Sequence, residues 1–268
     1  LVHGFLVMLM AMGFTCLEAG LVRSKNTAAI CLKNVGLYSL AGIMFYLVGY
    51  GFMYNEVNGF IGQPTLWNPE TEVSSADGYS KMSDWFFQMV FCATAMSIVS
   101  GTIAERIKLA PFFIFAVILT GIIYPIQGSW VWGGGFLMEL GTVDLAGGLV
   151  VHETAGIAAL VIACFLGTRK DTGKPPHNPG YVMLGACMLW VGWFGFNAGS
   201  QLAANGSAGM TLLVTHLSAS AASLSWAAYE YFKHGKASLV GLVTGTIAGL
   251  ATITPASGSV TPLEAILL

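Results

Sequence analysis

The sequence predicts an all-α polytopic membrane protein, and three observations lead to this fold class. Of the 268 residues, 55% are hydrophobic and only 9% are charged, whereas a soluble domain carries about 25% charged residues. The mean hydropathy is +0.72. Apolar runs of roughly 20 residues, the length that crosses a bilayer as a helix, recur along the whole chain. These runs are continuous rather than alternating, which favours helices over a β-barrel.

Eight apolar runs have the length expected of a membrane span. In chain order they cover residues 2–22, 28–54, 84–104, 109–127, 143–167, 180–199, 208–232 and 239–254. The longest connection, residues 55–83, is polar, and its Pro64, Pro69 and SSADG run are typical of a loop. The last residues, from Pro262 to the closing AILL, read as the start of a ninth span. We therefore expect one membrane domain over 1–268 that is cut at both ends of this sequence.

The basic residues predict the orientation in the membrane. Nine of the eleven Lys and Arg lie in the connections after the first, third, fifth and seventh spans: Arg23, Lys25, Arg106, Lys108, Arg169, Lys170, Lys174, Lys233 and Lys236. The opposite connections hold only Lys81, and Lys33 lies just inside the second span. By the positive-inside rule, we expect the odd-numbered connections to be cytoplasmic and the N-terminus to be outside.

Several classes of protein are excluded by composition. The net charge of −2, without a basic patch, argues against a nucleic-acid partner. The five cysteines are scattered singly through the apolar runs: Cys16, Cys31, Cys92, Cys164 and Cys187. No CxxC pair is present, so we expect neither disulfides nor zinc, and we interpret the cysteines as small buried hydrophobic residues. We expect no metal and no cofactor.

The stretch VDLAGGLVVHETAGIAAL, residues 143–160, places ionisable side chains in an otherwise apolar run. Asp144 stands at the expected outer start of the fifth span, where a carboxylate accepts from free backbone N–H groups and favours the helix dipole. The simplest interpretation is a helix cap, which can also shape an outer vestibule. His152 follows eight residues later, about 12 Å deeper in a regular helix and therefore close to mid-bilayer.

A histidine in the middle of a membrane helix is a functional-site hypothesis, and a hydrogen-bonded packing histidine is the alternative. The positions around His152 at helical spacing are small: Gly148, Ala155, Gly156 and Ala159. They leave a narrow space for the imidazole or allow close helix contact. Glu153 points about 100° away from His152 in a regular helix, and protonation or a basic partner would lower the cost of burying it.

Aromatic side chains gather on the expected outer side. WVWGGG, WVGWFGFNAGS and WFFQMVF contribute Trp130 and Trp132; Trp190, Trp193, Phe194, Phe196 and the following Ser200; and Trp85, Phe86, Phe87 and Phe91. We place Trp130 and Trp132 in the connection after the fourth span. An interfacial aromatic belt is one interpretation. The other is a vestibule whose ring faces attract a small cation, an interaction worth about 1–2 kcal/mol when desolvated.

Three further patterns concern packing. FTCLEAGL in the first span and WFGFNAGS in the sixth are similar. The sixth span is five spans further along the chain than the first, an odd number, so the two copies would form an inverted repeat, as in many transporters, with the pathway at the repeat interface. We assign residues 1–167 to the first repeat and 168–268 to part of the second. Gly241, Gly245 and Gly249 predict close helix packing, and His216 among hydroxyl side chains favours a hydrogen-bonded structural role.

Five motifs in this order resemble the Amt/Mep/Rh ammonium transporter family, and its Amt branch most closely. They are GLVRSKN, GTIAERIK, WGGGFL, DLAGGLVVH and GWFGFNAGS, and they extend from the first span to the sixth, with the resemblance continuing to the last residues. The resemblance implies about eleven spans, an outside N-terminus and an inverted five-plus-five repeat. It also implies an Amt-type helical bundle assembled as a homotrimer with one pore in each subunit.

The resemblance also assigns roles to residues. Trp132, Ser200 and Phe91 would form the outer cation-binding site, and Phe91 and Phe196 would be the stacked rings that close the outer mouth. Trp193 would line the pore nearby. Asp144 would organise the vestibule from the helix start, without touching the substrate. His152 would be one of two histidines lining an apolar pore, and the second belongs to a span that this sequence does not contain.

Two residues depart from the family pattern, and several functions stay open. Leu145 stands where an aromatic residue or serine is usual, and Glu153 where an uncharged residue is usual. An ammonium sensor joined to a cytoplasmic signalling module is therefore the alternative to a transporter. A generic cation channel, which conducts ions including potassium without deprotonation, is a third hypothesis. A haem enzyme with His152 and His216 as axial ligands is a fourth, although we expect no enzyme.

The resemblance implies partners and a location. The substrates are ammonium and ammonia, and the surroundings are membrane lipid, in the cell or plasma membrane. A PII-type regulatory protein or an appended signalling domain is the expected cytoplasmic partner.

Overall fold

The computed structural model describes residues 1–68, 78–169 and 173–268. Within these ranges the regular secondary structure is helical and includes no β-strand, which confirms the all-α fold class. The helices are α1 (Val2–Leu21), α2 (Thr27–Met44), α3 (Tyr50–Tyr54), α4 (Lys81–Thr102), α5 (Leu109–Ile118), α6 (Tyr124–Val131), α7 (Phe136–Glu139), α8 (Thr154–Leu166), α9 (Pro179–Gly199), α10 (Gly206–His234), α11 (Leu239–Ile253) and α12 (Pro262–Leu267). Pro69, residues 74–77 of the SSADG run, and Lys170 lie outside the described residues.

In the described part of the chain, six helical segments are long and apolar enough to cross a membrane. They are Val2–Leu21, Ser24–Tyr54, Lys81–Thr102, Leu109–Glu139, Gly148–Leu166 and Pro179–Gly199. The two remaining predicted spans are also helices, but neither combines the length and the hydropathy of the other six. α10 has 29 residues and carries many Ser, Thr and His side chains, which lower its hydropathy. α11 is apolar and has 15 residues, fewer than the roughly 20 of a full crossing.

In the residues that the structure describes, three helices contain a π-helical segment, in which the hydrogen bonds span one residue more than in an α-helix. These segments are η2 (Phe45–Gly49), η3 (Leu119–Ile123) and η4 (Gly148–Glu153). The segments η2 and η3 pack against each other, and a Cβ atom on Gly121 would lie 2.7 Å from the Met44 methyl group. Such π-bulges occur often at functional sites. The third segment, η4, contains His152.

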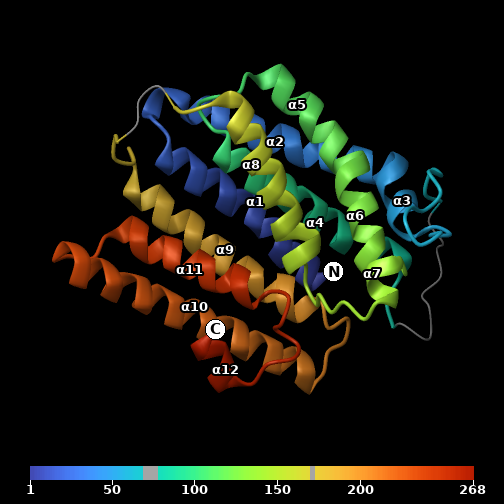
Figure 1. The fold of residues 1–268 in the computed structure, drawn as a ribbon. Helices are drawn as coiled ribbons and strands as arrows, with labels where there is room; N and C mark the ends of the chain where they lie inside the picture. The colour runs from blue at the N-terminus through green and yellow to red at the C-terminus, as the bar shows by residue number, and fades with distance from the viewer. Residues whose placement is uncertain (69–77, 170–172) are drawn as a thin grey trace. The chain divides into compact units, whose positions relative to one another are not determined.

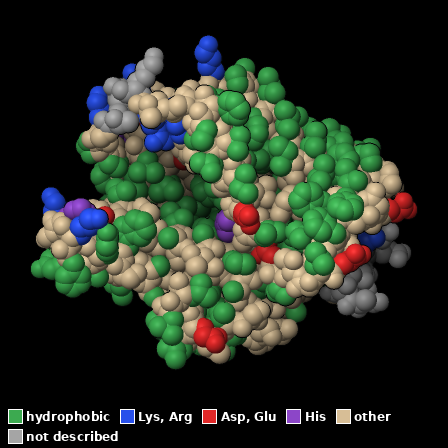
Figure 2. Space-filling view, in the orientation of Figure 1, with side chains coloured by type: hydrophobic (Ala, Val, Ile, Leu, Met, Phe, Trp, Pro, Cys, Tyr) green, Lys and Arg blue, Asp and Glu red, His purple; other side chains and the backbone are tan. Residues whose placement is uncertain are grey.

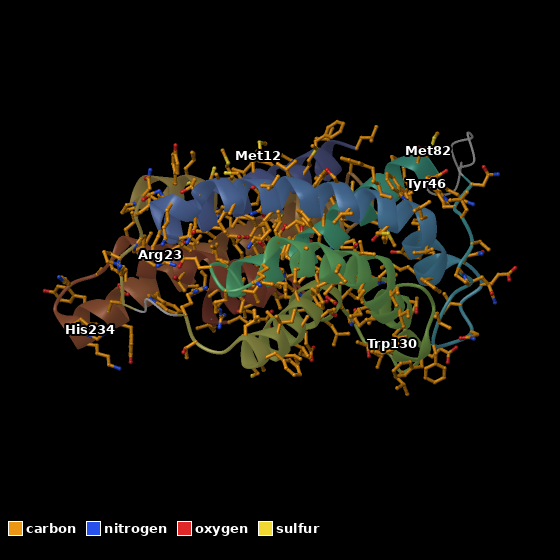
Figure 3. The ribbon with its side chains drawn as sticks, turned by 90° about the horizontal axis from the view of Figure 1, so that it is seen from above. Met12, Arg23, Tyr46, Met82, Trp130 and His234 are labelled. Carbon is orange, nitrogen blue, oxygen red and sulfur yellow. The ribbon has the colours of Figure 1, made fainter. Side chains whose placement is uncertain are left out.

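The chain forms two compact units, and the first contains Leu1–Gly4, Leu32–Val143 and Leu149–Gly167. In it α4 packs against α8, and α5, η3 and α6 follow one another as one continuous rod (Figure 1). The buried Lys33 donates from Nζ to the Ser100 carbonyl oxygen at 2.8 Å, near the C-terminal end of α4. Figure 3 shows Tyr46 and Met82 at the same end of this unit, where the Tyr46 and Trp85 ring centroids are 6.2 Å apart.

The outward side of this unit is apolar. Ile114 and Ile118 of α5 and Ile122 and Ile123 of η3 are 62%, 40%, 44% and 40% exposed. Figure 2 shows a broad hydrophobic surface over α5 and the helix that continues it. Exposed isoleucine on successive turns of a helix is the pattern of a lipid-facing surface, because lipid tails solvate apolar side chains that water would not.

The second unit contains Phe5–Cys31, Asp144–Gly148 and Thr168–Leu268. In it α10 and α11 lie side by side in opposite directions (Figure 1), α9 packs against both, and α12 packs against α10. α1 crosses α9 closely, since a Cβ atom on Gly185 would lie 2.6 Å from the Gly13 carbonyl oxygen. This unit thus includes Phe5–Cys31 in addition to the predicted residues 168–268. The inverted repeat itself stays a prediction.

The predicted small-residue face of α11 is confirmed. A Cβ atom on Gly245 would lie 2.7 Å from the Ala222 carbonyl oxygen, and one on Gly249 would lie 2.5 Å from that of Ser218. The Ser218 hydroxyl donates to the Gly249 carbonyl oxygen at 2.9 Å. Close approach of α10 and α11 therefore depends on glycine at these positions.

We expect Gly249→Ala to destabilise the protein by about 1–3 kcal/mol, because the added methyl group has no space in this contact. Gly209→Ala on α10 is the matched control, since no atom outside its own helix lies within 4 Å of its Cβ position. It should leave stability unchanged or raise it by up to about 1 kcal/mol. Thermal unfolding of the purified protein in detergent measures both, and equal effects would contradict the packing role.

Candidate functional site

In the first unit, the predicted residues Phe91 and Trp132 lie together. Their ring centroids are 6.1 Å apart at an interplanar angle of 75°. Phe87, one helical turn before Phe91 on α4, adds a third ring at 4.8 Å from Phe91. Phe91 is 1% exposed, while Trp132 is half-buried. The group therefore has a buried aromatic base and one partly open indole.

Trp132 is positioned by the end of α6 rather than by a loop. The sequence placed Trp130 and Trp132 in a connection, and this was wrong: Trp130 lies inside α6, and Trp132 is its C-cap residue, with its N–H donating to the Gly128 carbonyl oxygen at 2.8 Å. Helix propensity within WVWGGG is low, yet the helix continues to Val131, and Gly128 in its last turn packs closely against Met53. Trp130, labelled in Figure 3, donates from Nε1 to the Phe60 carbonyl oxygen at 2.7 Å.

The glycines after Trp132 let the chain leave the helix at once. Gly134 has a φ of +85°, a conformation that costs little only for glycine. A Cβ atom on Gly133 would overlap the Met53 carbonyl oxygen. The Gly135 N–H then donates back to the Ser129 carbonyl oxygen at 2.9 Å. This tight turn keeps Trp132 at the helix end, and the three glycines that follow it carry no side chain.

In the second unit, α9 presents Trp193, Phe196 and Ser200 at spacings of three and four residues, which place them on one face of the helix. Trp193 and Phe196 are 2% and 0% exposed, and their ring centroids are 5.8 Å apart. The Ser200 hydroxyl donates to the Phe196 carbonyl oxygen at 2.7 Å. Because that bond uses the hydroxyl hydrogen, the oxygen lone pairs remain available to accept from an N–H donor.

Asp144 has the geometry of a helix cap. Its Oδ1 accepts from the Gly147 and Gly148 N–H groups at 2.9 and 2.8 Å. The helical segment begins at Gly148 with η4, five residues later than the sequence predicted. The reason is that Asp144 binds the N–H groups of the first turn from outside the helix. The depth of about 12 Å for His152, which assumed a regular helix from Asp144, therefore does not hold.

His152 is half-buried in η4, directly after the buried Val150 and Val151. Glu153, the last residue of η4, is exposed. The spacing of about 100° between them assumed α-helical geometry, which this segment does not have. Nothing in the described structure explains the carboxylate at Glu153.

Among the described residues, the structure therefore forms three local groups: Phe91 with Trp132, Phe196 with Trp193 and Ser200, and Asp144 with the start of η4. The His216 ring stacks on Trp190 at 5.3 Å and 29° and lies 6.1 Å from Phe194. Its hydrogen-bonded role stays a prediction. Residues 1–68, 78–169 and 173–268 contain no group of three His, Cys, Asp or Glu that could hold a metal ion.

Sequence reasoning missed one residue that contacts this site. Thr254 accepts a hydrogen bond of 2.8 Å from Trp193 Nε1–H. Only the Thr-Pro pair at the end of the last apolar run, TITPASG, could have drawn attention to it.

The six apolar helical segments in the described part of the chain define a polytopic membrane protein. Comparison with known proteins agrees with this class and narrows it. The sequence profile of the Ammonium Transporter Family matches residues 1–268, and the chain belongs to this family. It is an integral membrane protein, and its family is one of transporters rather than enzymes.

The relatives are similar along the whole chain. An ammonium transporter of Aquifex aeolicus is 39% identical over 100% of this chain and 64% of its own length. One from Bacillus subtilis is 38% identical over 98% and 66%. A solved structure titled Sensor Amt Protein has a TM-score of 0.93 at 35% identity, with coverage of 99% and 69%. The crystal structure of Candida albicans Mep2 has a TM-score of 0.91 at 31% identity, with coverage of 99% and 61%. The chain thus spans slightly less than two thirds of the two transporters' length.

Proposed function

We propose that the protein binds ammonium at an outer aromatic site and conducts ammonia or ammonium across the membrane through an apolar, histidine-lined pore. Trp132, Phe91 and Ser200 bind the ion. The observation that carries this proposal is the Phe91–Trp132 ring pair, in a chain whose full length matches the ammonium transporter family. The half-buried Trp132 offers an indole face, which attracts a cation by about 1–2 kcal/mol when desolvated.

Binding at such a site distinguishes ammonium from potassium by hydrogen bonding. A bare cation loses many kcal/mol of hydration when it enters an apolar region. Ammonium has N–H donors, and the Ser200 oxygen, whose own hydrogen is donated to Phe196, accepts from one of them. Potassium has no donor and gains only the electrostatic part of the interaction. The two ions are similar in size, so this chemistry provides selectivity that radius does not.

Conduction requires the ion to lose a proton. Phe91 and Phe196 close the outer mouth, Trp193 lines the pore beyond them, and His152 provides a polar group on an apolar wall. Ammonium gives up its proton near the Phe pair and ammonia crosses beside His152, while the proton follows through the histidines. Potassium cannot follow, because it has no proton to lose. Asp144 shapes the vestibule through its cap and does not touch the substrate.

The remaining parts of the proposal concern assembly and orientation. The protein acts as a homotrimer with one pore in each subunit, its N-terminus outside and its odd-numbered connections cytoplasmic. The distribution of Lys and Arg along the sequence supports this orientation. A PII-type regulatory protein binds from the cytoplasmic side.

Reconstitution tests the function directly. We expect the complete natural protein in liposomes to give a current or internal pH change on an ammonium pulse, and to take up methylammonium. A potassium pulse of equal concentration should give none, because the pathway requires a proton that can be lost. Equal responses to potassium and methylammonium would contradict the mechanism and indicate an ordinary cation channel.

A second candidate is an ammonium sensor, and the similarity to the Sensor Amt Protein favours it. It uses the same outer site with negligible flux and transmits occupancy to a cytoplasmic signalling module. Isothermal titration with methylammonium, done beside the liposome assay, separates the two functions. Saturable binding without flux indicates the sensor, and binding with flux indicates the transporter.

A further inference from the structure

The hydroxyl of Thr254 is a buried acceptor for one indole. Thr254 is 0% exposed and is the C-cap residue of α11. Its own hydrogen is donated to the Leu250 carbonyl oxygen at 2.7 Å. Its lone pairs therefore face the Trp193 indole, whose Nε1–H lies 2.8 Å away and can only donate. Both partners are buried, so water does not compete for this hydrogen bond.

Not every buried indole N–H on α9 has a hydrogen-bond acceptor. Trp190 is one turn before Trp193 on α9, and its Nε1 is also buried. In the described part of the chain this atom has no hydrogen-bond partner. A buried tryptophan usually finds one. Acceptors are therefore not present at every buried indole of α9, and the hydrogen bond to Thr254 orients the Trp193 ring in particular.

Pro255, the residue after Thr254, contacts a second part of the candidate site, the start of the fifth span. The Pro255 carbonyl oxygen accepts from the Leu145 N–H at 3.1 Å, next to the capping Asp144. A Cβ atom on Gly148 would lie 2.6 Å from the Pro255 ring. All of these residues belong to the second unit. One turn at the end of α11 therefore orients the Trp193 indole and contacts the start of the fifth span.

We propose that Thr254 is a positioning residue for transport, which acts by orienting the Trp193 indole through its Nε1–H. This inference rests on the proposed function, in which Trp193 lines the pore. Without the hydroxyl, the indole N–H is left buried and unpaired, and the ring turns to find another acceptor. A ring that has turned narrows the pore or presents an N–H donor that holds passing ammonia. Conduction then slows, while binding at Trp132, Phe91 and Ser200 is retained.

The test compares Thr254→Val with Thr254→Ser in the complete natural protein in liposomes. We expect Thr254→Val, which keeps the shape but not the hydroxyl, to lower the Vmax of methylammonium uptake about tenfold, because one buried donor loses its acceptor. The KM should stay unchanged, and Thr254→Ser should restore the Vmax. Thr246→Val is the matched control, since the Thr246 hydroxyl donates within its own helix to the Leu242 carbonyl oxygen.

Two further measurements separate positioning from a general structural defect. In a Trp193→Phe background, Thr254→Val should have no additional effect on Vmax, because the donor is already absent. The indole ¹⁵N–¹H signal of Trp193 in tryptophan-labelled protein, assigned by its loss in Trp193→Phe, should shift in Thr254→Val and not in Thr246→Val.

Unchanged uptake in Thr254→Val, or an equal loss in the Trp193→Phe background, would overturn the inference. If Trp193→Phe impairs transport and Thr254→Val does not, only the positioning role of Thr254 is contradicted. If Trp193→Phe leaves transport unchanged, the pore-lining role of Trp193 is contradicted, and so is the inference about Thr254. A protein that takes up no methylammonium in its natural form contradicts the proposed function instead.

Discussion

Replacing His152 by aspartate is expected to make the protein conduct potassium. Potassium is excluded from an apolar pore because a bare cation there has no counter-charge. A carboxylate in η4 supplies one, worth about 4 kcal/mol at 4 Å and an effective dielectric constant near 20. That energy is enough to raise potassium permeation by roughly two to three orders of magnitude. The ratio of potassium to methylammonium uptake in liposomes measures the change.

Two variants make this experiment decisive. His152→Ala removes the imidazole without adding charge, so it should lower ammonium flux and still exclude potassium. His234→Asp applies the same change at an exposed position at the end of α10, labelled in Figure 3, and should keep the selectivity of the natural protein. If His152→Asp excludes potassium as well as the natural protein does, His152 does not line the conduction pathway.

Replacing Trp132 by leucine is expected to weaken ammonium binding rather than transport at saturation. The substitution removes an indole whose edge-to-face partner, the buried Phe91, is 6.1 Å away. The loss of about 1–2 kcal/mol of cation–π attraction raises the KM for methylammonium by roughly 5- to 30-fold. The Vmax should change little, because the barrier in the apolar pore lies beyond this site.

Trp130→Leu provides the control for that prediction. Trp130 is two residues away in the same helix, and its Nε1–H donates to the Phe60 carbonyl oxygen in the preceding loop. The variant should lose some thermal stability and keep the KM of the natural protein. Titration of uptake against methylammonium concentration gives both constants. A KM that is equal in Trp132→Leu and the natural protein would show that Trp132 is not part of the binding site.

Local pattern was enough for the fold class and for most helices. The apolar runs at 2–22 and 180–199 correspond to α1 (Val2–Leu21) and α9 (Pro179–Gly199) within one or two residues. Hydropathy sums over neighbours in the chain, so it reports such helices well. It failed for the start of the fifth span, because capping by Asp144 and the π-helical geometry of η4 depend on individual hydrogen bonds.

The candidate site was predictable in part, and for two different reasons. Trp193, Phe196 and Ser200 share a face of α9 because their spacing in the chain is helical, which the sequence alone shows. Trp132 and Phe91 were paired only by the family resemblance, since they are 41 positions apart in the chain. Their ring contact becomes visible when α4 and α6 are packed. The sequence placed Trp132 in a connection, whereas it caps the end of α6.

By itself, the sequence determined that this protein is a bundle of apolar helices, where most of these helices lie, and which aromatic and ionisable side chains interrupt their apolar pattern. Only the tertiary structure decided which polar atoms meet. Trp193 and Thr254 are 61 positions apart, and Lys33 reaches the carbonyl of Ser100 across 67. The physical reason is that hydrophobicity acts through the composition of a whole face, whereas a hydrogen bond requires two atoms within about 3 Å, and only helix packing sets that distance.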